Sequence, residues 1–212
     1  MVAIALLTGA AYFLAARLSL ILLTEPDGVA VFWPAAGISS GVLIALGQSA
    51  RLPVAASVMV ATALANLIGD RNLAGSIVFA MCNAGEAIII AWLIEHYFGS
   101  GFALDNLRRV LGFLLATLVG TAISGIGGTA GFILFHSSEA YLSATWLHWF
   151  TSDALGVVLV APLESDLRAV FPIRGNCWSW ETGCRRSSRS SWSAQSDLVR
   201  RRITGSQSCR WP

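Results

Sequence analysis

Long apolar runs alternate with short polar joints from Met1 to about Pro162. A bilayer hydrocarbon core of about 30 Å needs roughly 20 apolar helical residues to cross it, and six segments reach or approach that length. They are Val2–Leu23, Val29–Gly47, Leu52–Ile68, Leu73–Tyr97, Val110–Phe135 and Ala144–Leu163. Because only helices satisfy their own backbone in lipid at this length, the pattern predicts an all-α fold, a polytopic transmembrane bundle of about six spans.

Composition supports lipid as the solvent of this region. The mean hydropathy is +0.66 and only 12% of residues are charged, against roughly 25% in an ordinary soluble domain. A water-soluble fold of this size needs more polar surface. The sequence therefore excludes a soluble enzyme or binding domain over residues 1–165.

The remaining residues, 166–212, form a second region of different character. Residues 1–162 carry five Arg and eight acids, a net charge of −3, whereas residues 163–212 carry nine Arg and four acids, a net charge of +5. Arg, Ser, Trp and Cys are enriched there without apolar periodicity, so we expect a disordered tail. Two explanations stay open: a shifted reading frame that truncates the product, or a genuine basic tail attracted to anionic lipid.

Charge in the joints predicts the orientation. The basic joints are Arg51, Arg108, Arg109 and the tail from Arg168, and the mostly acidic joints contain Glu25, Asp27, Asp70, Arg71 and Glu139. Because basic residues concentrate on the cytoplasmic side, we expect both termini in the cytoplasm and the chain in a bacterial inner membrane. The lipid bilayer is then its first partner, and nothing in the sequence indicates nucleic acid.

The positions of the tryptophans and glycines predict interfacial anchoring and close helix packing. Trp33, Trp146 and Trp149 fall near the predicted outer boundary, where interfacial anchoring is favoured over ligand contact. The fifth span places four glycines within residues 125–131. Close approach of a neighbouring helix is the favoured explanation, and an unwound segment lining a cavity is the alternative. Gly37 and Gly41 repeat the same spacing.

Three charged residues lie within spans, at a cost of about 2.5–3.5 kcal/mol each. Arg17 and Asp153 have about the same predicted depth, and Glu86 lies closer to the midplane. One interpretation is an Arg17–Asp153 ion pair that holds the first and last helices in register. The other is a polar pocket, open to the periplasmic side, that binds a small ligand or proton. Asn66 and Asn83 lie at neighbouring depths, and Glu86 is either a functional group or a protonated carboxyl hydrogen-bonded to Asn83 or another helix.

The residue pattern does not indicate a catalytic site, a metal site or a cofactor site. His148 precedes Ser152 by one helical turn, but a nucleophile and base also need a third group that orients the base. Cysteine spacing matches no zinc site, and no Walker loop, dinucleotide fingerprint or zinc-protease motif occurs. We expect no enzyme activity, no metal and no cofactor.

Four blocks in order resemble a known family. They are VFWPAAGI at 31–38 with LIALG at 43–47, ANL at 65–67, NAGEA at 83–87, and WLHWFTSDALG at 146–156 with VAPL at 160–163. Together they resemble the MASE-type bacterial membrane sensor domain, first class. The blocks cover about 130 residues, and the match rests on their combination.

The resemblance implies a sensory input module, which in that family precedes histidine kinases, diguanylate cyclases and related output domains. Family members usually continue into further spans and an output domain after the last block, and here the basic tail follows instead. The open alternatives are a small transporter or permease and a non-functional fragment. A second copy of the chain or a partner signalling protein is the expected protein partner. The candidates for sensing a small ligand or a proton are Arg17, Trp33, Asn66, Asn83, Glu86, Trp149 and Asp153.

Overall fold

The computed structural model describes residues 1–21, 30–99, 101–135 and 142–164. Within these ranges the chain is helical and contains no strand, which confirms the all-α prediction. The helices are α1 (Val2–Ile21), α2 (Pro34–Leu46), α3 (Arg51–Ile68), α4 (Leu73–Phe98), α5 (Leu107–Phe135) and α6 (Leu142–Val160), with 3-10 turns η1 (Gln48–Ala50) and η2 (Ala161–Glu164). The predicted tail at 166–212 lies outside the described residues, as do Glu25, Asp27 and Glu139.

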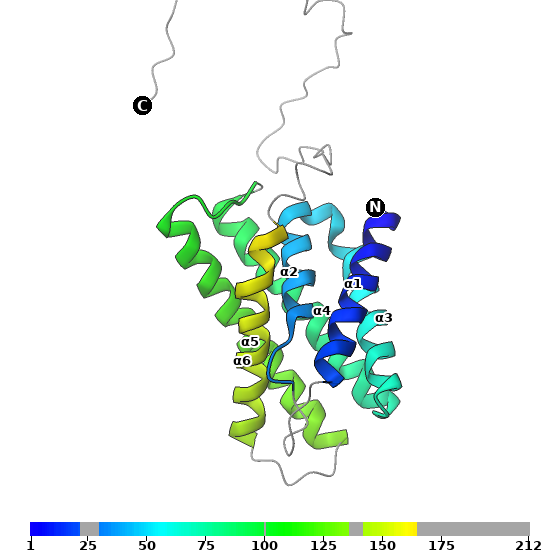
Figure 1. Ribbon diagram of the computed structural model, residues 1–212. Coiled ribbons are helices and arrows are strands. Elements are labelled where there is room, and N and C mark those ends of the chain that lie inside the picture. Colours follow the sequence, from blue (N-terminus) through cyan, green and yellow to red (C-terminus); the bar gives the residue numbers. More distant parts are fainter. Residues whose placement is uncertain (22–29, 100, 136–141, 165–212) are drawn as a thin grey trace, which may run out of the picture. The chain divides into compact units, whose positions relative to one another are not determined.

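Consecutive helices run in alternating directions, so the α2–α3 and α4–α5 joints lie at one end of the bundle and the α3–α4 joint at the other (Figure 1). Helix α4 packs on α3 and α5, α1 packs on α3 and α2, and α6 packs on α5 and α2. Five of these helices are long and apolar enough to cross a membrane.

Helix α2 is the exception in length. Its 13 residues span about 20 Å at 1.5 Å per residue, less than the roughly 30 Å of a hydrocarbon core. Most of its residues are buried, and its neighbours are α1, α4 and α6. A helix that is apolar on all sides is a core element, so α2 belongs to the core of the bundle, where α1, α4 and α6 cover it.

Backbone contact joins α2 to α6. Pro34 begins α2 at a position where its missing N–H costs nothing. The N–H of Trp33 just before it donates to the Ser152 carbonyl at 3.2 Å. A Cβ at Gly156 would lie 2.0 Å from the Trp33 carbonyl oxygen, and one at Gly37 would lie 2.2 Å from that of Gly156. Only glycine at both positions allows this crossing, which confirms close packing as the role of Gly37.

The glycines of α5 serve the same purpose. A Cβ at Gly128 would lie 2.5 Å from the indole of Trp149, and one at Gly131 would lie 2.7 Å from Val78. Helix α5 runs without a break from Leu107 to Phe135. Close packing is therefore confirmed, and the alternative of an unwound segment is wrong.

Replacement of Gly156 by alanine should destabilise the bundle, because the added methyl group would overlap the Trp33 carbonyl. Overpacking of this kind costs about 1–3 kcal/mol, so we expect a lower melting temperature for the detergent-solubilised protein. Gly85→Ala in α4 is the matched control, since a Cβ there meets nothing within 4 Å. Equal melting temperatures for the two variants would contradict the proposed backbone contact.

Candidate functional site

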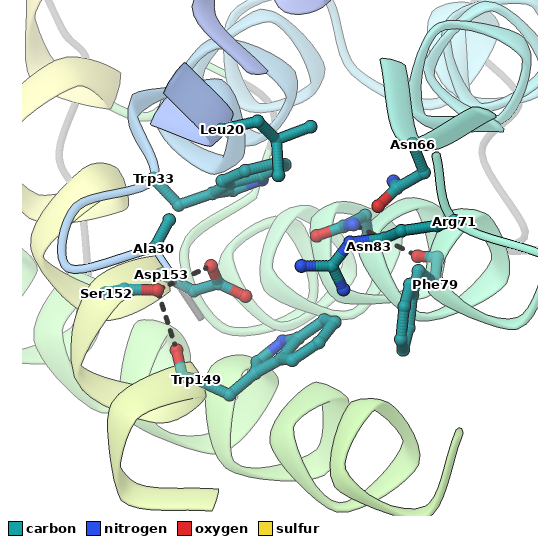
Figure 2. Close-up of a pocket in the computed structure, with 10 residues that line it drawn as sticks. All are labelled: Leu20, Ala30, Trp33, Asn66, Arg71, Phe79, Asn83, Trp149, Ser152 and Asp153. Atoms are coloured by element: carbon teal, nitrogen blue, oxygen red, sulfur yellow. Dashed lines mark hydrogen bonds between the residues drawn. The ribbon is translucent and has the colours of Figure 1, made fainter. Parts of the chain in front are cut away.

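A pocket of about 40 Å³ lies between α1, α3, α4 and α6, near the end of the bundle that holds the α3–α4 joint (Figure 2). This volume suffices for a few water molecules or a ligand of a few heavy atoms. Aromatic, amide and charged side chains share its wall. The lining residues are Leu20, Ala30, Trp33, Asn66, Arg71, Phe79, Asn83, Trp149, Ser152 and Asp153.

Two carboxyl groups meet beside this pocket. Asp153 of α6 lines it, and Glu86 of α4 lies within hydrogen-bonding reach of Asp153. Each residue is 2% exposed. The Ser152 hydroxyl donates to Asp153 Oδ1 at 3.4 Å. The second Asp153 oxygen and both Glu86 oxygens receive no hydrogen bond of good geometry from an N–H or hydroxyl group of the described residues. The Trp149 indole lies beside Asp153, and the Ser124 hydroxyl lies beside Glu86.

A carboxyl group donates a hydrogen bond only when it is protonated. A hydrogen bond between Glu86 and Asp153 therefore requires at least one proton, so the pair carries at most one negative charge. A hydrogen bond between Asn83 and Glu86, one of the two alternatives drawn from the sequence, is not observed, because the Asn83 amide donates to the Phe79 carbonyl at 3.0 Å. The partner of Glu86 is a residue of another helix, as the second alternative predicted.

Trp33 forms one side of the pocket. It is 8% exposed, and its indole N–H donates to the Tyr12 hydroxyl at 3.3 Å. Tyr12 itself is fully buried. Trp149 also lines the pocket and packs over Gly128. Interfacial anchoring in lipid is therefore wrong for these two tryptophans, because both line the pocket in the interior of the bundle.

Arg71 reaches the pocket from the α3–α4 joint. Figure 2 shows its guanidinium directed inward, on the side opposite Asp153. The guanidinium carbon lies 5.5 Å from the ring centre of Phe79 and 5.8 Å from that of Phe132, a cation–π arrangement. Burial lowers the pKa of Arg71 from its ordinary value, but a guanidinium stays protonated in proteins. The pocket thus holds a cation facing a carboxyl.

The two asparagines are held by their own helices. Asn66 donates to the Thr62 carbonyl at 2.9 Å, as Asn83 does to Phe79 one helix away. The Asn83 Oδ1 atom accepts no hydrogen bond from the described residues. With its amide N–H so engaged, Asn83 presents an acceptor to the pocket (Figure 2).

The pocket brings together most of the residues that the sequence singled out. Trp33, Asn66, Asn83, Trp149 and Asp153 line it, and Glu86 lies behind Asp153.

Arg17 does not belong to this group. Its guanidinium donates to the Ala65 carbonyl at 3.1 Å, in the last turns of α3. Among the described residues it forms no ion pair with Asp153, so that prediction is wrong. The physical reason is that α1 packs on α3 and α2, which turns Arg17 away from α6.

Sequence reasoning missed several residues in and around the pocket. Tyr12 and Phe79 resemble ordinary core aromatics at helical spacing. Arg71 was visible as the one basic residue among otherwise acidic joints, and that exception was the available signal. The sequence indicates Ser152 only as a candidate nucleophile, whereas in the structure its hydroxyl donates to the Trp149 carbonyl at 3.2 Å and to Asp153.

Comparison with known proteins gives one match. The sequence model of the MASE1 family matches residues 3–164. Neither the curated proteins nor the solved structures contain a match. The matched range includes the whole pocket and nearly all of every described helix.

Replacement of Tyr12 by phenylalanine should lower the melting temperature. It removes the acceptor of the buried Trp33 N–H, and an unsatisfied buried donor costs about 1–3 kcal/mol. Thermal unfolding followed by tryptophan fluorescence measures the effect. Tyr97→Phe is the matched control because Tyr97 is 70% exposed, and an equal effect of both changes would argue against the Trp33–Tyr12 hydrogen bond.

Proposed function

The chain belongs to the MASE1 family of membrane sensory domains, and from this premise we propose that its helical bundle is the sensory input module of a bacterial signal-transduction protein. The stimulus acts at the pocket around Asp153. The response is a change in the packing of α6, which passes the signal to a cytosolic output domain.

The observation that supports this proposal is the buried carboxyl pair beside the pocket. Asp153 and Glu86 come from two different helices, α6 and α4, and their contact depends on one proton. A ligand or proton that alters the charge of the pair alters the attraction between those helices. A stimulus shifts a conformational equilibrium only through different affinity for the two states, and a helix-bridging carboxyl pair supplies such a difference.

Helix α6 is suited to carry the response. It holds Trp149, Ser152 and Asp153 at the pocket, touches α2 through Gly156, and continues into η2 at residues 161–164. Its far end lies at the end of the bundle that also carries the α2–α3 and α4–α5 joints (Figure 1). Movement at the pocket is therefore coupled to the opposite end of the same helix.

The transporter alternative requires paired broken helices around the site. Helices α4, α5 and α6 are each continuous through the described residues that surround the pocket. This continuity favours the sensor over a transport pathway.

Charge in the joints supports a multi-pass orientation in the bacterial inner membrane, with the pocket end facing the periplasm. Asp70→Cys and Asp105→Cys, each in a chain whose native cysteines are replaced by serine, test it. A membrane-impermeant maleimide added to spheroplasts should label the variant at 70 and spare the one at 105. The reverse pattern would contradict the proposed orientation.

A chimera tests the signalling role. A diguanylate cyclase domain placed behind residue 164 should give cyclic di-GMP levels that change about fivefold or more, a common size of allosteric coupling, across a panel of small metabolites and external pH values. Asp153→Asn should hold the output at one level, because it abolishes the titrating pair.

Asp105→Asn is the control for that experiment, since Asp105 is exposed and pairs with Arg109 at the opposite end of the bundle. A wild-type output that is constant over the whole panel, or an Asp153→Asn output that follows the wild type, would refute the sensory proposal.

A further inference from the structure

The wall of the pocket contains buried hydrogen-bond acceptors that lack a donor. Asn83 Oδ1 receives no hydrogen bond from the described residues, and Asp153 Oδ2 receives none of good geometry from their N–H or hydroxyl groups. Asn83 and Asp153 are 5% and 2% exposed. A buried acceptor without a donor costs about 1–3 kcal/mol. A small ligand with several N–H groups would donate hydrogen bonds to these acceptors.

The charge of the same wall is negative. With one proton shared between Glu86 and Asp153, the pair carries one negative charge, and Asp153 is the member of the pair that lines the pocket. The indole rings of Trp33 and Trp149 line the same pocket, and the Trp149 indole lies beside Asp153. A carboxylate flanked by indole rings favours an ammonium group, through both ion pairing and cation–π attraction.

The opposite wall is positive. The Arg71 guanidinium is directed into the pocket, with the rings of Phe79 and Phe132 close to its central carbon. A guanidinium held in this way recognises a carboxylate through its planar N–H fork. A simple cation would meet repulsion from Arg71, and a simple anion would meet repulsion from Asp153. A ligand that carries both charges is complementary to both walls.

We propose that this pocket binds a small zwitterion, with its ammonium group on Asp153 and its carboxylate on Arg71. The cavity volume of about 40 Å³ limits the ligand to the size of a small amino acid such as glycine or alanine. Asn83 accepts a further ammonium hydrogen, and Glu86 holds the charge of Asp153 in place from behind. This inference deepens the proposed sensory function and rests on it for biological meaning, but the binding itself does not require a signalling output.

Equilibrium binding of radiolabelled glycine, alanine, serine and β-alanine to the purified full chain in lipid nanodiscs tests the proposal. We expect saturable binding of at least one of them. Methylammonium and acetate, which each carry half of the ligand, should compete at least about tenfold more weakly, equivalent to about 1.4 kcal/mol.

Three variants sharpen the result. Asp153→Asn and Arg71→Gln should each weaken binding about tenfold or more. Asp105→Asn, in the exposed Arg109 pair, should leave binding unchanged. A melting temperature for each variant separates lost binding from lost folding.

Three outcomes would overturn the proposal: none of the four zwitterions binds, methylammonium or acetate binds as tightly as glycine, or Asp153→Asn and Arg71→Gln bind as the wild type does while folded. Water alone would then satisfy the acceptors of the pocket. The chimera separates the two claims. Zwitterion binding with a constant cyclase output would refute the sensory role alone, whereas a responsive output without zwitterion binding would refute the ligand class alone.

Discussion

The structure depends on direct backbone contact between the segment entering α2 and the middle of α6. Trp33 donates its N–H to the Ser152 carbonyl, and its own carbonyl lies against Gly156. In lipid, burial of apolar side chains supplies no driving force between helices, so close packing and hydrogen bonds hold them together. This contact supplies both, and it places the Trp33 ring and the Asp153 carboxyl on the same pocket.

Charged groups in the bundle are accommodated by two different means. A hydrogen bond between Glu86 and Asp153 needs at least one proton, which leaves at most one negative charge on the pair where hydration is absent. Arg17 instead reaches the Ala65 carbonyl near the C-terminal end of α3, where the helix dipole favours a cation. Pairing Arg17 with Asp153 would have neutralised both charges and left no negative wall in the pocket. The separation of these residues is therefore what gives the site its polarity.

Much of the architecture could be predicted from the sequence, because apolar runs of about 20 residues have one stable form in lipid. The sequence also identifies four polar residues within the spans, Asn66, Asn83, Glu86 and Asp153. Polar groups at this depth are costly, so they either pair with another group or have a functional role. Depth follows from the helical rise, but rotation about the helix axis and the choice of neighbour do not. Arg17 shows that limit. The shortness of α2 shows a second limit. The apolar run begins at residue 29, yet the helix begins only at Pro34, because the preceding Trp33 donates its N–H to α6. That contact depends on a residue more than a hundred positions away, which no local pattern reports.

The burial of α2 has a consequence for biosynthesis. Its docking partner on α6 is synthesised 119 residues after Trp33, counting from 33 to 152. At about 5–20 residues per second, the ribosome needs roughly 6–24 s to produce it. During that interval α2 is a helix too short to cross the bilayer, held only by α1, α3 and α4 as they emerge. Among the described helices, α6 thus supplies the last wall of the pocket, which forms only when α6 arrives.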